Sequence, residues 1–169
     1  MRTTFDVRPA TLADLSAVDA LLGRSYPALL KTAYPPSILV TAIPLISKAN
    51  PRLLASGTYF VVTDGDAVIG AGGWTREQPG RGGAARSRIG HIRHVVTDHR
   101  RVREGVGKSL MLKVFQTAHA GGVEVLECLS TRVAVPFYDA MGFETVGPTS
   151  IALRQGIEFP AIHMRKSLA

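Results

Sequence analysis

One glycine-containing segment has residue types and spacing suited to binding a charged ligand. It spans residues 103–109, Arg-Glu-Gly-Val-Gly-Lys-Ser, and it follows an apolar run at 92–96. Glycine lets the backbone approach a ligand closely, and the first amide N–H groups of a helix point outward from its start. Positive charge surrounds the segment, from Arg100, Arg101, Arg103 and Lys108. The segment therefore predicts a phosphate-binding turn between a strand and a helix.

The elements that must position this turn follow from the hydrophobic pattern. Apolar residues recur at helical spacing in four segments, while β-rich runs bounded by turn residues predict strands. The expected helices cover about 12–22, 37–48 (interrupted by Pro44), 106–118 and 136–141. The expected strands cover 3–8, 59–63, 67–74, 89–97, 123–129, 144–153 and 157–166. This order predicts a single α/β domain over residues 1–169, with a helical insertion after the first strand.

Composition narrows the classes of protein and partner. The chain of 169 residues is 46% hydrophobic and 20% charged, which is typical of a globular domain. It has no apolar run near the ~18 residues of a membrane span and no signal-peptide pattern, so a cytoplasmic protein is expected. The single cysteine, Cys128, excludes an internal disulfide, and His99 and His163 lack ligand-spaced partners, so no metal site is expected. The net charge of +7 favours an anionic partner: nucleic acid, an acidic membrane surface or a polyphosphate cofactor.

Two motifs in this order resemble those of the GNAT superfamily of acyl-CoA N-acyltransferases. The first is Ile-Arg-His-Val-Val at 92–96 leading into the glycine turn at 103–110. The second is Ala-Val-Pro-Phe-Tyr-Asp-Ala-Met-Gly-Phe at 134–143, which is similar to the family pattern A-x-x-F-Y-x-x-x-G-F. Because both motifs fall on matching elements, the resemblance covers nearly the whole chain.

The resemblance implies a fold, a cosubstrate and a reaction. The implied fold is a mixed, mostly antiparallel sheet of six to seven strands flanked by about four helices, with the fourth and fifth strands splayed apart. The implied reaction is acetyl transfer from acetyl-CoA to a primary amine, without a metal. The implied cofactor-binding residues are Val95, Val96 and Thr97 along the fourth strand, and Arg103, Glu104, Gly105, Val106, Gly107, Lys108 and Ser109 in the turn.

The sequence departs from the family pattern at two places. Val102 stands where the family has Gln or Arg, although Arg101 and Arg103 flank it. Phosphate binding through backbone amides is expected to survive this change. Arg132 or Val133 replaces an asparagine that often precedes the second motif, which removes one contact to the pantetheine arm.

Tyr138 and His91 are the catalytic residues that the resemblance implies. A phenol has an ordinary pKa near ~10, so Tyr138 is a candidate acid that protonates the departing thiolate. Counting back from the glycines places His91 where relatives often have a catalytic glutamate, and a backbone N–H near Val95 would act as an oxyanion donor. A bulge, frequent in this strand of the family, would change which side chains share a face. His94, Glu77 and a base-free reaction through water are the alternatives to His91.

Other functions compete with this interpretation. Gly-Lys-Ser at 107–109 ends like a P-loop, but the glycine that a P-loop needs at 102 is absent. A basic nucleic-acid-binding module is a rival from another class, although the chain lacks an aromatic-studded strand or a recognition helix. A non-catalytic acyl-CoA sensor is a third. The expected acceptor is a small-molecule or protein amine, and its identity depends on the N-terminal helices, the loop at 78–87 and the last strands. Tyr26, Tyr34 and Trp74 could make the acceptor site apolar. Dimerisation is common in the family, so a homodimer is a further expectation.

Overall fold

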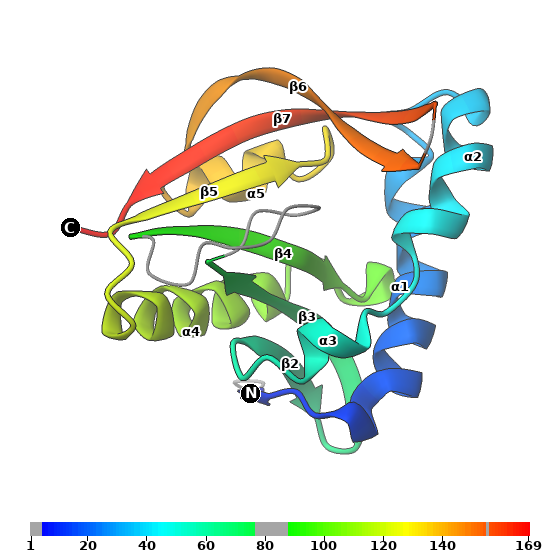
Figure 1. Ribbon diagram of the computed structural model, residues 1–169. Helices are drawn as coiled ribbons and strands as arrows, with labels where there is room; N and C mark the ends of the chain where they lie inside the picture. Colours follow the sequence, from blue (N-terminus) through cyan, green and yellow to red (C-terminus); the bar gives the residue numbers. More distant parts are fainter. Residues whose placement is uncertain (1–4, 77–87, 155) are drawn as a thin grey trace.

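The central sheet is mixed and mostly antiparallel, as expected. The computed structural model describes residues 5–76, 88–154 and 156–169, and its sheet has the order β1-β2-β3-β4-β5-β7-β6 (Figure 1). Only the β4–β5 neighbours are parallel. The strands are β1 Asp6–Pro9, β2 Tyr59–Asp64, β3 Ala67–Thr75, β4 Ile89–Thr97, β5 Val125–Ser130, β6 Glu144–Arg154 and β7 Ile157–Ser167.

Helices cover both faces of this sheet. The α-helices are α1 Leu15–Leu30, α2 Pro36–Ile46, α3 Pro51–Leu54, α4 Val106–Ala120 and α5 Val135–Ala140, and short 3-10 turns span Leu12–Asp14 and His99–Arg101. Thr11 and Asp14 form a capping box at the entry to α1. The brief α3, capped by Asn50, was not expected, and Pro44 lies inside α2 rather than ending it.

Two apolar clusters hold the helices to the sheet. On one face, Leu110 and Met111 of α4 pack with Ile92 and Leu126. On the other face, α1 and α2 pack against β2, β3 and β7. A Cβ on Gly72 would lie 2.7 Å from Val95 Cγ2 and 2.9 Å from Leu110 Cδ2, so only glycine allows α4 this close to β3. The core therefore fixes the start of α4 against the end of β4.

The fourth and fifth strands form a fork. β4 and β5 pair only where Ile89–His91 faces Val125–Glu127, and beyond this point they diverge (Figure 1). The expected bulge is present in β4, because Arg93 pairs with Gly73 and Val96 with Ala71. His94, with φ of 49°, absorbs the extra residue. The bulge turns Val95 toward α4, and His94 lies next to Tyr26 of α1, at 6.2 Å between ring centroids.

Candidate active site

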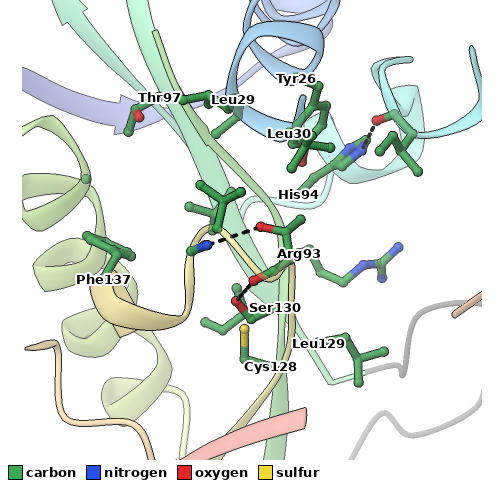
Figure 2. Close-up of a pocket in the computed structure, with 18 of the residues that line it drawn as sticks. Tyr26, Leu29, Leu30, Arg93, His94, Thr97, Cys128, Leu129, Ser130 and Phe137 are labelled. Atoms are coloured by element: carbon green, nitrogen blue, oxygen red, sulfur yellow. Dashed lines mark hydrogen bonds between the residues drawn. The ribbon is translucent and has the colours of Figure 1, made fainter. Parts of the chain in front are cut away.

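The opening of the fork leads into a large cavity. Its volume is about 1140 Å³, and its walls come from both fork strands, the glycine turn, α1, α2, α5 and the β6–β7 hairpin. Figure 2 shows side chains of α1, β4, β5 and α5 around it. The predicted cofactor residues Val95, Val96 and Thr97 line this cavity along β4. One cavity therefore joins the diverging strands to the start of α4.

The glycine turn begins α4 without a side-chain cap. Gly105 is the N-cap residue with φ of 87°, and no side chain bonds to the first amides of the helix. Gly107 lies under Phe137, where a Cβ would come within 2.8 Å of the ring. Uncapped amides at the start of a 15-residue helix form a site for an anion. The local geometry thus fits the phosphate cradle predicted from the sequence.

Not all of the predicted residues of the turn face the cavity. Arg103, Gly105, Val106, Gly107 and Lys108 line it. Glu104 instead accepts hydrogen bonds from Arg101, and the amide of Ser109 donates to the carbonyl of Gly105 within the helix.

The cations of the turn divide into two groups. Arg100 binds the carboxylate of Asp98 at 2.9 Å, and Arg101 binds Asp64 at 2.9 Å as well as Glu104. Arg103 and Lys108 have no ion pair within the described part of the chain. These two side chains are therefore the cations most readily available to a bound anion.

Asp98 is a structural residue that the sequence analysis missed. Only 1% exposed, it accepts hydrogen bonds from Arg100 and from Arg24 of α1. These guanidinium groups hold the pKa of its carboxyl well below the usual range. Asp98 also caps the 3-10 turn that follows β4. It thereby fixes the chain just before the glycine turn, and the Asp-x-Arg pattern after a strand was the available signal.

Tyr138 lies in the wall of the cavity with its ring held by neighbours. Its ring makes edge contacts with Phe137 at 5.2 Å and with Phe143 at 5.3 Å between centroids. Its hydroxyl forms a hydrogen bond with Cys128. Burial raises the pKa of Tyr138 well above its usual value and raises the pKa of the Cys128 thiol to about 12. Tyr138 therefore keeps its proton at neutral pH, and Cys128 is an un-ionised thiol.

The two candidate histidines occupy different places. His94 lines the cavity, and its Nε2 lies 2.8 Å from the carbonyl oxygen of Ile46 (Figure 2). His91 lies at the base of the fork, half-buried, and is not among the described residues that line the cavity. Burial lowers the pKa of both imidazoles below the usual value. Both histidines are therefore neutral at neutral pH and able to accept a proton.

Glu127 gathers a polar cluster at the base of the fork. It pairs with His91 across the parallel strands and forms a hydrogen bond with His163 of β7. Arg165 lies 3.6 Å from its second oxygen. The charge of Glu127 raises the pKa of His91, in partial opposition to burial. The sequence analysis did not identify Glu127, because its partners come from distant strands.

Two aromatic residues considered for the acceptor pocket do not face the cavity. Trp74 is buried toward α4 and donates a hydrogen bond to Thr117 at 3.0 Å. Tyr34 stacks on Phe159 at 4.6 Å and donates to the carbonyl of Pro160. Tyr26 does line the cavity. The alternative base Glu77 and the loop at 78–87 lie outside the described residues.

The described residues give no sign of a metal site or of a membrane span. Within 5–76, 88–154 and 156–169, no group of three His, Cys, Asp or Glu side chains is arranged to hold a metal ion. In the same part of the chain, no helix is both long and apolar enough to cross a membrane.

Comparison with known families and structures agrees with this geometry. The chain matches the family described as acetyltransferase (GNAT) domain over residues 42–168, and it belongs to that family. No curated protein matches the chain. The fold is therefore that of the GNAT superfamily, as the two motifs predicted.

Three solved structures illustrate the similarity of fold. A GCN5-related N-acetyltransferase from Rhodopseudomonas palustris has a TM-score of 0.78 at 18% identity, with 99% of this chain and 98% of that chain covered. PaiA N-acetyltransferase from Thermoplasma acidophilum, in complex with coenzyme A, has a TM-score of 0.73 at 13% identity, with 97% of this chain and 99% of that chain covered. N-acetylglutamate synthase from Neisseria gonorrhoeae, complexed with coenzyme A and N-acetyl-glutamate, has a TM-score of 0.62 at 15% identity, with 98% of this chain and 35% of that chain covered.

Proposed function

We propose that this protein is an N-acetyltransferase that moves an acetyl group from acetyl-CoA to a primary amine. The observation that carries the proposal is the fork itself. β4 and β5 stop pairing after His91 and Glu127, and the space between them opens into a cavity that ends at the uncapped start of α4. An extended pantetheine arm fits between diverging strands, and a pyrophosphate fits helix amides flanked by Arg103 and Lys108.

The residues present fit coenzyme A. Gly107 brings the backbone against Phe137 with no room for a Cβ, and no side chain caps the first amides of α4, which leaves these amides to a ligand. Free backbone polar groups of β4 beyond the fork can bond to the amides of the pantetheine arm, as a strand would. The backbone N–H near Val95 is the proposed donor to the thioester carbonyl oxygen. Acetyl-CoA supplies the activated acyl group in this reaction.

The protein's own residues would then handle two protons. The amine nitrogen forms a C–N bond to the acyl carbon as the C–S bond breaks, which leaves a proton on nitrogen and a negative charge on sulfur. Tyr138, un-ionised and in the cavity wall, donates its proton to the sulfur. A neutral histidine, His91 at the fork or His94 in the cavity, accepts the proton from nitrogen, directly or through water. The cytoplasmic location and a homodimer stay predictions.

Binding and turnover test this proposal separately. A ligand at 100 times its Kd stabilises a fold by about 2.7 kcal/mol, which raises the melting temperature by about 5–10 °C in a protein of this size. Acetyl-CoA should produce this shift, and ATP and a DNA duplex at matched ionic strength should not. Amine-dependent thiol release from acetyl-CoA then measures transfer. A response to DNA with none to acetyl-CoA would instead support the nucleic-acid-binding alternative, and tight binding without transfer to any amine would support a sensor.

A further inference from the structure

The cavity has a second arm that points away from the glycine turn. This acceptor arm runs between the helices α1 and α2 and the β6–β7 hairpin, and its walls are mostly apolar. The side chains that form it include Leu30, Leu45, Ile46, Ile151 and Phe159. It meets the phosphate-binding part of the cavity at the β4 bulge, next to His94. A molecule in this arm therefore reaches the end of the fork, where the proposed acyl transfer takes place.

The charged residues that line the cavity are of one sign. The described residues that line the cavity include no aspartate or glutamate, and the charged lining residues other than the cations of the glycine turn are Lys48 and Arg93. His94 is held with its Nε2 against the carbonyl of Ile46, and burial lowers its pKa, so it is neutral. An ammonium group deep in this arm would lose water without gaining a counter-charge.

We propose that the acceptor is an apolar monoamine: a primary amine on an aromatic or aliphatic body with no second positive charge. This inference rests on the proposed acetyl transfer and names its acceptor class. Apolar walls favour such a body because its burial removes apolar surface from water. A polyamine or an aminoglycoside would bring further ammonium groups into an arm with cationic neighbours. Each additional ammonium group of such an acceptor would lose its water and find no carboxylate to pair with.

The acceptor class is tested with one apolar monoamine and one polyamine. 2-Phenylethylamine and spermidine are compared as acceptors at saturating acetyl-CoA, with thiol release as the readout. We expect kcat/KM for 2-phenylethylamine to exceed that for spermidine by about 100-fold or more, since an unpaired buried polar group discriminates more strongly than a methylene. Equal values, or a preference for spermidine, would overturn the inference.

A charge placed in the arm should reverse part of this preference. Leu45 lies on α2, is partly exposed and lines the cavity, so Leu45→Glu adds a carboxylate there without filling the core. We expect the ratio of the two kcat/KM values to fall about tenfold or more. Leu112→Glu is the matched control, because Leu112 lies in a helix but is 54% exposed and remote from the arm. A ratio that is unchanged in Leu45→Glu, or changed equally in the control, would contradict the inference.

Two further readouts separate this inference from the proposed function. The thermal shift with acetyl-CoA alone reports the function, so a spermidine preference in a protein that binds acetyl-CoA defeats only the acceptor class. Stabilisation of the coenzyme A complex by each amine gives the same comparison without turnover.

Octanoyl-CoA tests whether the arm holds the acyl chain instead. If octanoyl-CoA is the better donor and 2-phenylethylamine loses its advantage with it, the apolar arm belongs to the acyl group and the inference is wrong.

Discussion

Removing the hydroxyl of Tyr138 separates its chemistry from its packing. Tyr138→Phe keeps the ring and its edge contacts with Phe137 and Phe143. The substitution also breaks the hydrogen bond to Cys128, a weak partner, which should cost about 1 kcal/mol of stability or less. Loss of a general acid reduces kcat by about 10²–10⁴-fold, or about 2.7–5.4 kcal/mol in the barrier. The expected loss of rate thus greatly exceeds the expected loss of stability.

The assay measures kcat by thiol release at saturating acetyl-CoA, Kd for acetyl-CoA by calorimetry, and the free energy of unfolding by denaturant. Tyr34→Phe is the matched control, because it removes a buried hydroxyl that bonds to the carbonyl of Pro160 and the amide of Arg132, outside the cavity. The control should lose stability and keep kcat within about twofold. A kcat for Tyr138→Phe within that same range would refute its role as the acid.

Three further outcomes are expected. Gly107→Ala, whose Cβ would lie 2.8 Å from Phe137, should raise the calorimetric Kd for acetyl-CoA at least about tenfold; an unchanged Kd would place the cradle elsewhere. Glu127→Gln removes a charge that raises the pKa of His91, so the acid limb of kcat/KM should move to lower pH, and a fixed limb would argue against His91 as the base. Burial lowers the pKa of His94, so the stability contributed by its neutral imidazole is complete above about pH 6.5 and is lost as pH falls through the lowered pKa. The free energy of unfolding, measured with denaturant, should therefore depend less on pH in His94→Gln than in the unmodified protein. The same pH dependence in both proteins would contradict this.

The parts of the site that the sequence predicted are those encoded by neighbouring residues. Gly105 has the positive φ that a tight strand-to-helix turn needs, and α4 begins directly after it. Pro136 stands in the first turn of α5, and Gly142 has a positive φ just after its end, so a short helix around Tyr138 followed from local pattern. The order of strands on either side, and hence the fork, came from the resemblance rather than from periodicity.

The partners that tune the site lie far apart in the chain and had no local signal. Asp98 binds Arg24 across 74 residues, and His163 reaches Glu127 across 36. Such pairs depend on which strands and helices become neighbours, and spacing along the sequence does not encode that. Counting cations around the turn also overstated its charge, because Arg100 and Arg101 are paired with carboxylates. Only the fold shows which charges are neutralised.

One physical cause prepares both of the proposed proton-transfer groups. Burial disfavours the charged form of any side chain, so it keeps the proton on the phenol of Tyr138 and keeps a proton off the imidazoles of His91 and His94. The groups thus begin in the states that an acid and a base need, although the charge of Glu127 acts on His91 in the opposite direction. The cations Arg103 and Lys108 lie instead at the glycine turn, where a pyrophosphate would bind. A cavity that has Arg103 and Lys108 at the glycine turn, and no carboxylate among its described lining residues, can hold the cosubstrate by its phosphates and still admit an uncharged amine, the form that attacks a thioester.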